Sequence, residues 1–135
     1  MRKLAQISAI AATALFLAGS PSFAAVDTAG ALRNLDPDND GTIDMREAIK
    51  GAKRVFKMIN PDKDRTVDAA ELRGRLSPAG LAAADPDDDG TLTWREYKAL
   101  VKATFRAANP DEDGTIDLRE LQTPYGRQLL RLIYP

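Results

Sequence analysis

Four twelve-residue windows rich in acidic residues repeat along this chain of 135 residues. They read DPDNDGTIDMRE (36–47), NPDKDRTVDAAE (60–71), DPDDDGTLTWRE (85–96) and NPDEDGTIDLRE (109–120), and successive windows start 24, 25 and 24 residues apart. Of the 20 acidic residues, 17 stand at window positions 1, 3, 5, 9 or 12. A repeat this regular indicates four copies of one structural unit. We number the windows loops 1 to 4.

The spacing of oxygen-bearing residues within each loop is typical of an EF-hand metal site. Positions 1, 3 and 5 supply side-chain oxygens, position 7 a backbone carbonyl, position 9 a direct or water-mediated ligand and position 12 a bidentate glutamate. Alternating residues thus aim their oxygens at one hard cation. The predicted metal ligands are Asp36, Asp38, Asp40, Thr42, Asp44, Glu47, Asn60, Asp62, Asp64, Thr66, Asp68, Glu71, Asp85, Asp87, Asp89, Thr91, Thr93, Glu96, Asn109, Asp111, Asp113, Thr115, Asp117 and Glu120. Acidic turns that bind no metal are the alternative interpretation.

The four loops are not equal. Loop 1 has a carboxylate at positions 1, 3, 5, 9 and 12, whereas Thr93 replaces the position 9 carboxylate of loop 3 and Asn109 the leading carboxylate of loop 4. Loop 2 departs most, because Asn60 removes a charge and Arg65 stands where glycine is expected. A side chain there is forced towards positive φ at a cost of about 1 kcal/mol or more. We therefore rank the loops first, third, fourth, second in predicted affinity.

Only 12, 13 and 12 residues separate successive loops, so one helix must leave one loop and lead into the next. Apolar residues at helical spacing predict a buried face on the first and third connectors. They are Ile49, Ala52, Phe56 and Ile59 in the first, and Tyr97, Leu100, Val101 and Phe105 in the third. Such helices hold their two loops at opposite ends.

The middle connector is interrupted by Gly74, Ser77, Pro78 and Gly80, so it can fold back. We infer that loops 2 and 3 pair at one end, with loop 1 meeting loop 4 at the other, through short strands centred on the apolar residue at position 8. Pairing of loop 1 with loop 3 and loop 2 with loop 4 would require a straight middle helix. Residues 28–35 predict a further short helix. Thr123 and Pro124 predict the start of a last one, which buries Leu129, Leu130 and Ile133.

The amino terminus has the pattern of a signal peptide. Three residues that include Arg2 and Lys3 precede an uncharged apolar stretch (4–18), and Ser22 and Ala24 supply small residues before a cleavage site after Ala24. We expect residues 1–24 to be removed and residues 25–135 to form a single metal-binding domain in the periplasm. A membrane anchor is the alternative, although the 15 apolar residues fall short of the roughly 20 that span a bilayer.

Composition narrows the function. The chain has no cysteine and no histidine, which excludes thiolate sites and the usual ligand for zinc, copper and nickel. Without residues 1–24 it has 17 basic and 20 acidic residues, a net charge of minus three that points to no nucleic-acid partner. Nearly every acid is committed to a loop, and Ser77 has the setting of a helix cap rather than a nucleophile. We therefore expect no enzyme.

Taken together, these features resemble the lanmodulin family, the periplasmic lanthanide-binding EF-hand proteins of methylotrophic bacteria. The match rests on proline at position 2 of every loop, the DGT cores of three loops, aspartate at position 9 of three, and the short gaps between loops. The prolines are Pro37, Pro61, Pro86 and Pro110, and the position 9 aspartates are Asp44, Asp68 and Asp117. The resemblance covers essentially all of residues 25–135.

The resemblance implies an all-α fold, a compact three-helix bundle with four metal loops at its periphery that becomes ordered when metal binds. It also implies selective binding of lanthanide(III) ions such as La, Ce or Nd, with Ca²⁺ as the weaker ligand. The implied role is lanthanide handling by a monomer that contacts periplasmic lanthanide-dependent dehydrogenases or transporters transiently and has no membrane contact after processing. A calcium-binding sensor or structural module would use the same ligands, and dockerins also join calcium loops to single helices.

Overall fold

The computed structural model describes residues 27–61 and 63–135; the predicted signal peptide and Asp62 lie outside them. The described chain is mostly helical, with six helices and two small antiparallel sheets. The first helix, α2 (Thr28–Leu35), covers the predicted residues 28–35 and is capped by Asp27, whose carboxylate accepts the Gly30 N–H. No helix in the described ranges is long and apolar enough to cross a membrane.

Two long helices connect the loops as the short gaps predict. Helix α3 (Met45–Ile59) joins loop 1 to loop 2, and α5 (Trp94–Ala108) joins loop 3 to loop 4. All four apolar residues predicted for the buried face of α5 are buried. On α3 the prediction was partly wrong, since Ile49 and Ile59 are only half-buried. The buried face of α3 is rotated towards Ala48, Gly51 and Val55 because α5 and the last helix, α7 (Pro124–Ile133), both pack against α3.

The connector between loops 2 and 3 bends, as its glycines and proline predict. Residues 69–75 form turns, with Gly74 at φ 83°, and a short helix, α4 (Pro78–Ala84), leads into loop 3. Ser77 caps α4, and its hydroxyl accepts the Gly80 N–H at 3.0 Å. The chain can therefore reverse direction between loop 2 and loop 3.

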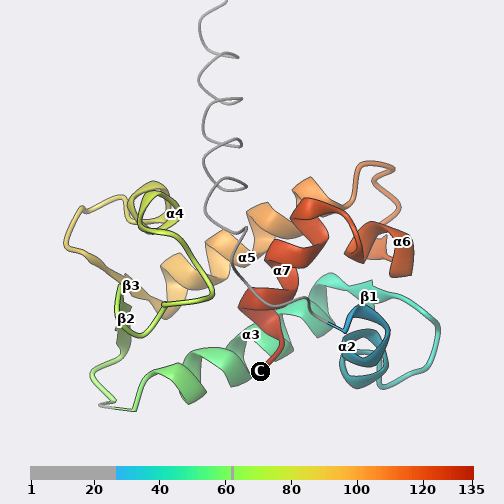
Figure 1. The fold of residues 1–135 in the computed structure, drawn as a ribbon, viewed down its shortest axis with the longest axis horizontal. Coiled ribbons are helices and arrows are strands. Elements are labelled where there is room, and N and C mark those ends of the chain that lie inside the picture. The colour runs from blue at the N-terminus through green and yellow to red at the C-terminus, as the bar shows by residue number, and fades with distance from the viewer. Residues whose placement is uncertain (1–26, 62) are drawn as a thin grey trace, which may run out of the picture.

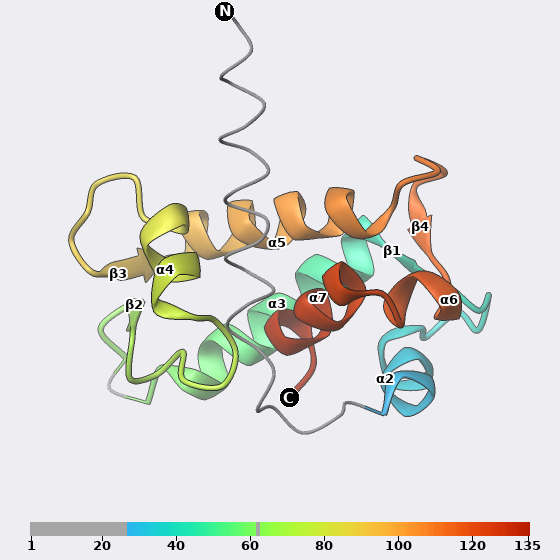
Figure 2. The same cartoon turned by 45° about the horizontal axis from the view of Figure 1, so that its top comes forward.

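The two sheets lie at opposite ends of the long helices (Figures 1 and 2). Strand β1 (Ile43–Asp44) pairs with β4 (Thr115–Ile116), and β2 (Thr66–Asp68) pairs with β3 (Thr91–Thr93). The position 8 residues face each other across each ladder, Ile43 with Ile116 and Val67 with Leu92. All four of these side chains are fully buried. The predicted pairing of loop 1 with loop 4 and of loop 2 with loop 3 is confirmed.

The carboxyl-terminal helix, α7 (Pro124–Ile133), follows the single-turn α6 (Leu118–Leu121) and packs against both α3 and α5. Thr123 is its N-cap, and the predicted Leu129, Leu130 and Ile133 are buried. Gly51 lets α7 approach α3 closely, because a Cβ there would lie 2.5 Å from the Ile133 carbonyl oxygen.

Hydrogen bonds tie the carboxyl-terminal end of the chain to α5 and to the turns after loop 2. The buried Tyr97 hydroxyl donates to the Leu132 carbonyl at 2.6 Å, and burial raises the pKa of this phenol. The Arg75 guanidinium donates to the carbonyls of Arg131 and Tyr134 at 2.7 and 2.9 Å. The segment after loop 2 is thereby fixed to the end of the chain.

Candidate metal centres

Each acidic loop begins at the end of a helix. Position 1 is the C-cap residue of α2, α3, α4 and α5 in turn, and all four of these side chains are buried. They are Asp36, Asn60, Asp85 and Asn109. Burying a carboxylate is costly unless it is hydrogen-bonded or paired with a cation. The surroundings of Asp36 and Asp85 therefore decide what loops 1 and 3 can hold.

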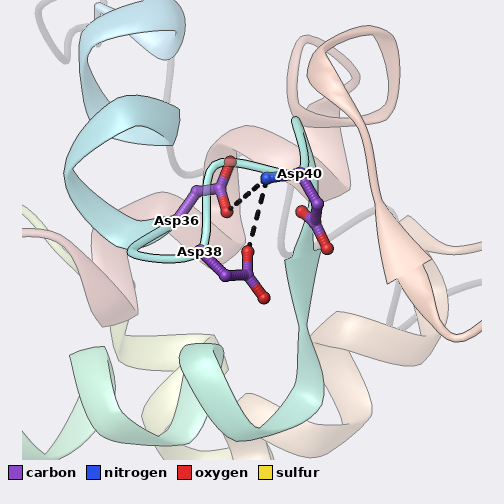
Figure 3. Close-up of side chains that lie close together, drawn as sticks. All are labelled: Asp36, Asp38 and Asp40. Atoms are coloured by element: carbon purple, nitrogen blue, oxygen red, sulfur yellow. Dashed lines mark hydrogen bonds between the residues drawn. The ribbon is translucent and has the colours of Figure 1, made fainter.

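Loop 1 gathers three carboxylates around one point (Figure 3). Asp36, Asp38 and Asp40 each place one carboxylate oxygen so that all three oxygens lie within 4.8 Å of one another. The Asp40 N–H donates to Oδ1 of Asp36 at 3.2 Å and to Oδ1 of Asp38 at 3.4 Å, while the Gly41 N–H donates to Oδ2 of Asp36 at 2.8 Å. These bonds hold the loop in a tight turn whose acidic side chains converge.

Loops 3 and 4 form equivalent groups that include the glutamate at position 12. Asp85, Asp87 and Glu96 bring one oxygen each within 4.8 Å of one another in loop 3. The corresponding residues Asp111, Asp113 and Glu120 do so in loop 4. Among the described residues these two groups and that of loop 1 are the acidic clusters that could hold a metal ion. The cation that such clusters bind best is hard, because every donor is an oxygen.

Threonine at position 7 orients the aspartate at position 5 in every loop. In loop 1 the Thr42 N–H and hydroxyl both donate to Oδ1 of Asp40, at 2.9 and 2.8 Å. The same pair of bonds runs from Thr66 to Asp64, Thr91 to Asp89 and Thr115 to Asp113. These bonds use the N–H and the hydroxyl of the threonine. The backbone carbonyl at position 7, which is the predicted metal ligand, is therefore not used by them.

Positions 9 and 12 also form a capping box, a role beyond the metal ligation predicted for them. In loop 1 the Asp44 carboxylate accepts the Glu47 N–H, and the Glu47 carboxylate accepts the Asp44 N–H, both at 2.8 Å. Asp117 with Glu120 and Thr93 with Glu96 repeat it at α6 and α5. The spacing Asp/Thr-x-x-Glu before a helix is the sequence signal that predicts it. Position 9 of loops 1, 3 and 4 therefore starts a helix as well as standing beside the predicted metal ligands.

Two carboxylate oxygens lack any protein partner. Oδ1 of Asp85 and Oε1 of Glu120 are buried and have no hydrogen-bond partner among the described residues. Asp85 as a whole is only 6% exposed. A buried charged oxygen left unpaired is among the costlier defects of a folded protein. A bound cation would remove that cost at loops 3 and 4, so the donor set fits a metal ion.

The electrostatics of loops 1 and 3 reflect crowded carboxyl groups. Proton sharing with the Asp85 carboxylate raises the pKa of Asp87 to about 6, with burial and the charge of Asp89 acting in the same direction. In loop 1 the hydrogen bond with Asp36 is the main cause that raises the pKa of Asp38. Like charges held this close resist full ionisation, and a cation placed between them would relieve that resistance.

The glutamates at position 12 are perturbed by burial. Burial is the main cause that raises the pKa of Glu47 and of Glu120, and the neighbouring aspartates of each loop add to it. These glutamates therefore hold their protons more tightly than free glutamate does. Ligation of a cation must overcome that desolvation as well as the bond to the capping-box N–H.

Loop 2 is the exception. Arg65 adopts φ 73°, beside 82°, 80° and 86° for Gly41, Gly90 and Gly114 at the same position of the other loops, so the predicted strain is confirmed. The described part of loop 2 contains no group of three converging carboxylates, while Asp62 lies outside it. Of the carboxylates predicted as ligands in loops 1, 3 and 4, Asp44, Glu47, Asp89 and Asp117 stand outside the converging groups.

Comparison with known proteins does not assign this arrangement to a family. No protein-family model matches the chain, and no curated protein matches it significantly.

Proposed function

We propose that this protein binds hard, oxygen-preferring cations in EF-hand-type loops and that its preferred ions are trivalent lanthanides. The observation that carries the proposal is that, in each of loops 1, 3 and 4, three carboxylate oxygens lie within 4.8 Å of one another. The unpartnered buried oxygen of Asp85 supports it, because a cation would satisfy that oxygen. The role is cation binding rather than catalysis. Calcium binding by the same loops is the alternative function.

Charge favours a trivalent ion over calcium. Coulomb attraction scales with the charge of the ion, so a trivalent ion of nearly calcium's size gains more from each added carboxylate. Loops 1 and 4 carry aspartate at position 9 as well as at positions 3 and 5. The pKa of Asp87, raised to about 6, supports the same preference because crowded carboxylates gain most from a highly charged ion.

A competition experiment separates the two ions. Trp94 stands at position 10 of loop 3, within an aromatic group in which its ring lies 5.6 Å from that of Phe56 and 6.3 Å from that of Tyr97. Terbium bound in loop 3 should therefore luminesce when Trp94 is excited. We expect this luminescence to survive a large excess of calcium. Ready displacement by calcium would leave a calcium-binding module, and absence of any luminescence or heat of binding would overturn the metal function.

Metal-coupled folding belongs to the same proposal. Four or five like charges in each loop repel one another, so part of the binding free energy should be seen as folding free energy. Packing among α3, α5 and α7 supports the expected three-helix bundle as the compact form. Circular dichroism of the metal-free chain should show less helix than the loaded chain. A fully helical metal-free spectrum that metal leaves unchanged would contradict this coupling.

Export to the periplasm and a role in lanthanide handling complete the proposal. The signal peptide predicted at residues 1–24 supports export, and fractionation of an expressing bacterium with amino-terminal sequencing would test cleavage after Ala24. Recovery of unprocessed chain in the cytoplasm would contradict export. Transient contact with lanthanide-dependent dehydrogenases or transporters, and a monomeric state, remain expectations of the family resemblance.

A further inference from the structure

Basic residues line the outer sides of the two long helices. A row of four runs along each helix: Arg46, Lys50, Lys53 and Lys57 on α3, and Arg95, Lys98, Lys102 and Arg106 on α5, while Arg54 of α3 stands beside its row. Their spacings of three and four residues place each set along one side of its helix. We name these eight residues the basic face. The acidic residues of the two helices are limited to Glu47 and Glu96, which stand in the first turns as position 12 of their loops.

Six side chains of the basic face are exposed, and those of Lys98 and Lys102 are half-buried. The buried residues of α3 and α5 pack towards each other and towards α7, which lies against one side of the pair (Figures 1 and 2). One cation of each row, Arg46 of α3 and Lys102 of α5, lines a shallow hollow together with Ile49, and Asp44 is its one acidic residue. Within the described chain, none of the eight side chains has a hydrogen bond or ion pair. Their charges are therefore available to a partner.

We propose that the basic face docks on a layer of anionic lipid headgroups. Charge complementarity requires an anionic partner, and the cations run along two 15-residue helices, each roughly 22 Å long, instead of converging on one pocket. A protein interface of ordinary composition also needs an apolar or aromatic centre. The large exposed apolar side chains among the described residues are Met58 and Leu118, and neither belongs to the basic face. An anionic membrane surface requires only clustered Lys and Arg.

Cation loading should control this docking, a step that rests on the proposed metal binding. The predicted processed chain carries a net charge of minus three, and its acidic loops flank the basic face at both ends. Three trivalent ions, one for each converging group, would bring the net charge to plus six. The loops would then no longer repel an anionic surface. This contact is peripheral, and it departs from the expectation that the processed chain avoids membranes.

Vesicle binding tests the proposal with two variants that each lose four positive charges. Full-length protein is mixed with phosphatidylcholine vesicles or with vesicles that also contain phosphatidylglycerol, in terbium or in EDTA, and the bound fraction is measured by sedimentation. Residues 1–24 are present in every sample, and the neutral vesicles measure their contribution. The test variant is K50Q/K53Q/K98Q/K102Q. The control R33Q/K63Q/R73Q/R127Q removes four charges from exposed side chains outside the basic face.

Each cation near an anionic surface strengthens binding about fivefold at low salt. We therefore expect the loaded wild-type protein to prefer anionic vesicles, the test variant to lose at least tenfold in affinity, and the control to lose much less. Binding should fall at about 0.5 M salt because the charges are then screened. If the test variant loses helicity, the K50Q/K53Q and K98Q/K102Q pairs are measured separately.

Other outcomes overturn the proposal. Equal binding to neutral and anionic vesicles would do so, as would equal losses in the test and control variants. Retention on a polyglutamate resin but not on vesicles would assign the basic face to an acidic protein. Terbium luminescence without anionic-vesicle binding would refute the docking and leave the metal function intact. Vesicle binding that needs the basic face but develops no terbium luminescence would support the surface and contradict the metal function.

Discussion

Loops 2 and 3 share one small sheet but differ in chemistry. Val67 pairs with Leu92 between them, and position 6 has φ 73° at Arg65 and 80° at Gly90, so the two backbones bend alike. Loop 3 begins with the buried Asp85, whereas loop 2 begins with the neutral Asn60. The comparison teaches that strand pairing and the threonine bonds at position 7 fix the loop shape even where the sequence opposes it. Ligand charge then decides what each loop can bind.

The largest effect is expected when a core residue shared by loops 2 and 3 is truncated. Leu92→Ala leaves a cavity under both loops, because Leu92 is fully buried against Val67. We expect a loss of about 3 kcal/mol in the free energy of unfolding, measured by urea denaturation of the metal-loaded protein. Leu118→Ala at the exposed Leu118 serves as control and should cost far less. Equal costs would mean that the β2–β3 pairing does not support the loops.

A second substitution isolates ligand charge. Glu96→Gln keeps a side chain that can accept the Thr93 N–H of the capping box but removes one negative charge from the loop 3 group. Because ligand charge sets EF-hand affinity over several decades, we expect terbium affinity at loop 3 to fall about 100-fold. Glu71→Gln in loop 2 should change the Trp94-sensitised signal little. A larger effect from Glu71→Gln would reverse the ranking of the two loops.

Acid should weaken loop 3 in a defined pH range. Asp87 must lose its proton to bind a cation, and its pKa is raised to about 6 by the bond with Asp85. Affinity should therefore level off near pH 7 and fall up to tenfold for each unit below about pH 6. In the metal-free chain the raised pKa favours folding below about pH 4, and this contribution is lost as the pH rises through about 6.

Terbium titration between about pH 5 and 7, read through Trp94, would follow the protonation of Asp87. The variant Asp87→Asn should bind more weakly but with a flatter pH profile. A wild-type affinity that stays constant over this range would rule out Asp87 as the controlling group.

The smallest effect concerns backbone strain. Arg65→Gly should raise the free energy of unfolding by roughly 0.5–1 kcal/mol, because glycine adopts positive φ without strain. The greater freedom of glycine in the unfolded chain offsets part of this gain. Arg65→Lys keeps both the charge and the strain and should be neutral, and Gly90→Ala in loop 3 should destabilise. No Cβ at Gly90 would meet an atom within 4 Å, so the penalty there is conformational. Thermal unfolding of the four proteins would expose the difference, and a destabilised Arg65→Gly would contradict it.

The sequence predicted the helices well where the cause is local. Caps at Ser77 and Thr123, the bend at Gly74 and the positive φ of Arg65 all follow from the chemistry of one or two neighbouring residues. The predicted buried face of α3 was partly wrong because the apolar residues of this helix fit two overlapping faces, one containing Ile49 and one containing Val55. Only contact with α5 and α7 selects between them.

The composition and spacing of the loops by themselves determined which residues offer oxygens and where the helices begin and end. They also determined that a single helix connects one loop to the next. Tertiary structure alone decided which oxygens meet, since the convergence of Asp85 with Glu96 depends on how β3, α4 and α5 pack. It also decided that Oδ1 of Asp85 is buried without a hydrogen-bond partner and that Arg46 and Lys102, one cation from each long helix, line the same hollow. The physical reason is that caps and turns act over a few residues, whereas burial and convergence are set by contacts between distant parts of the chain.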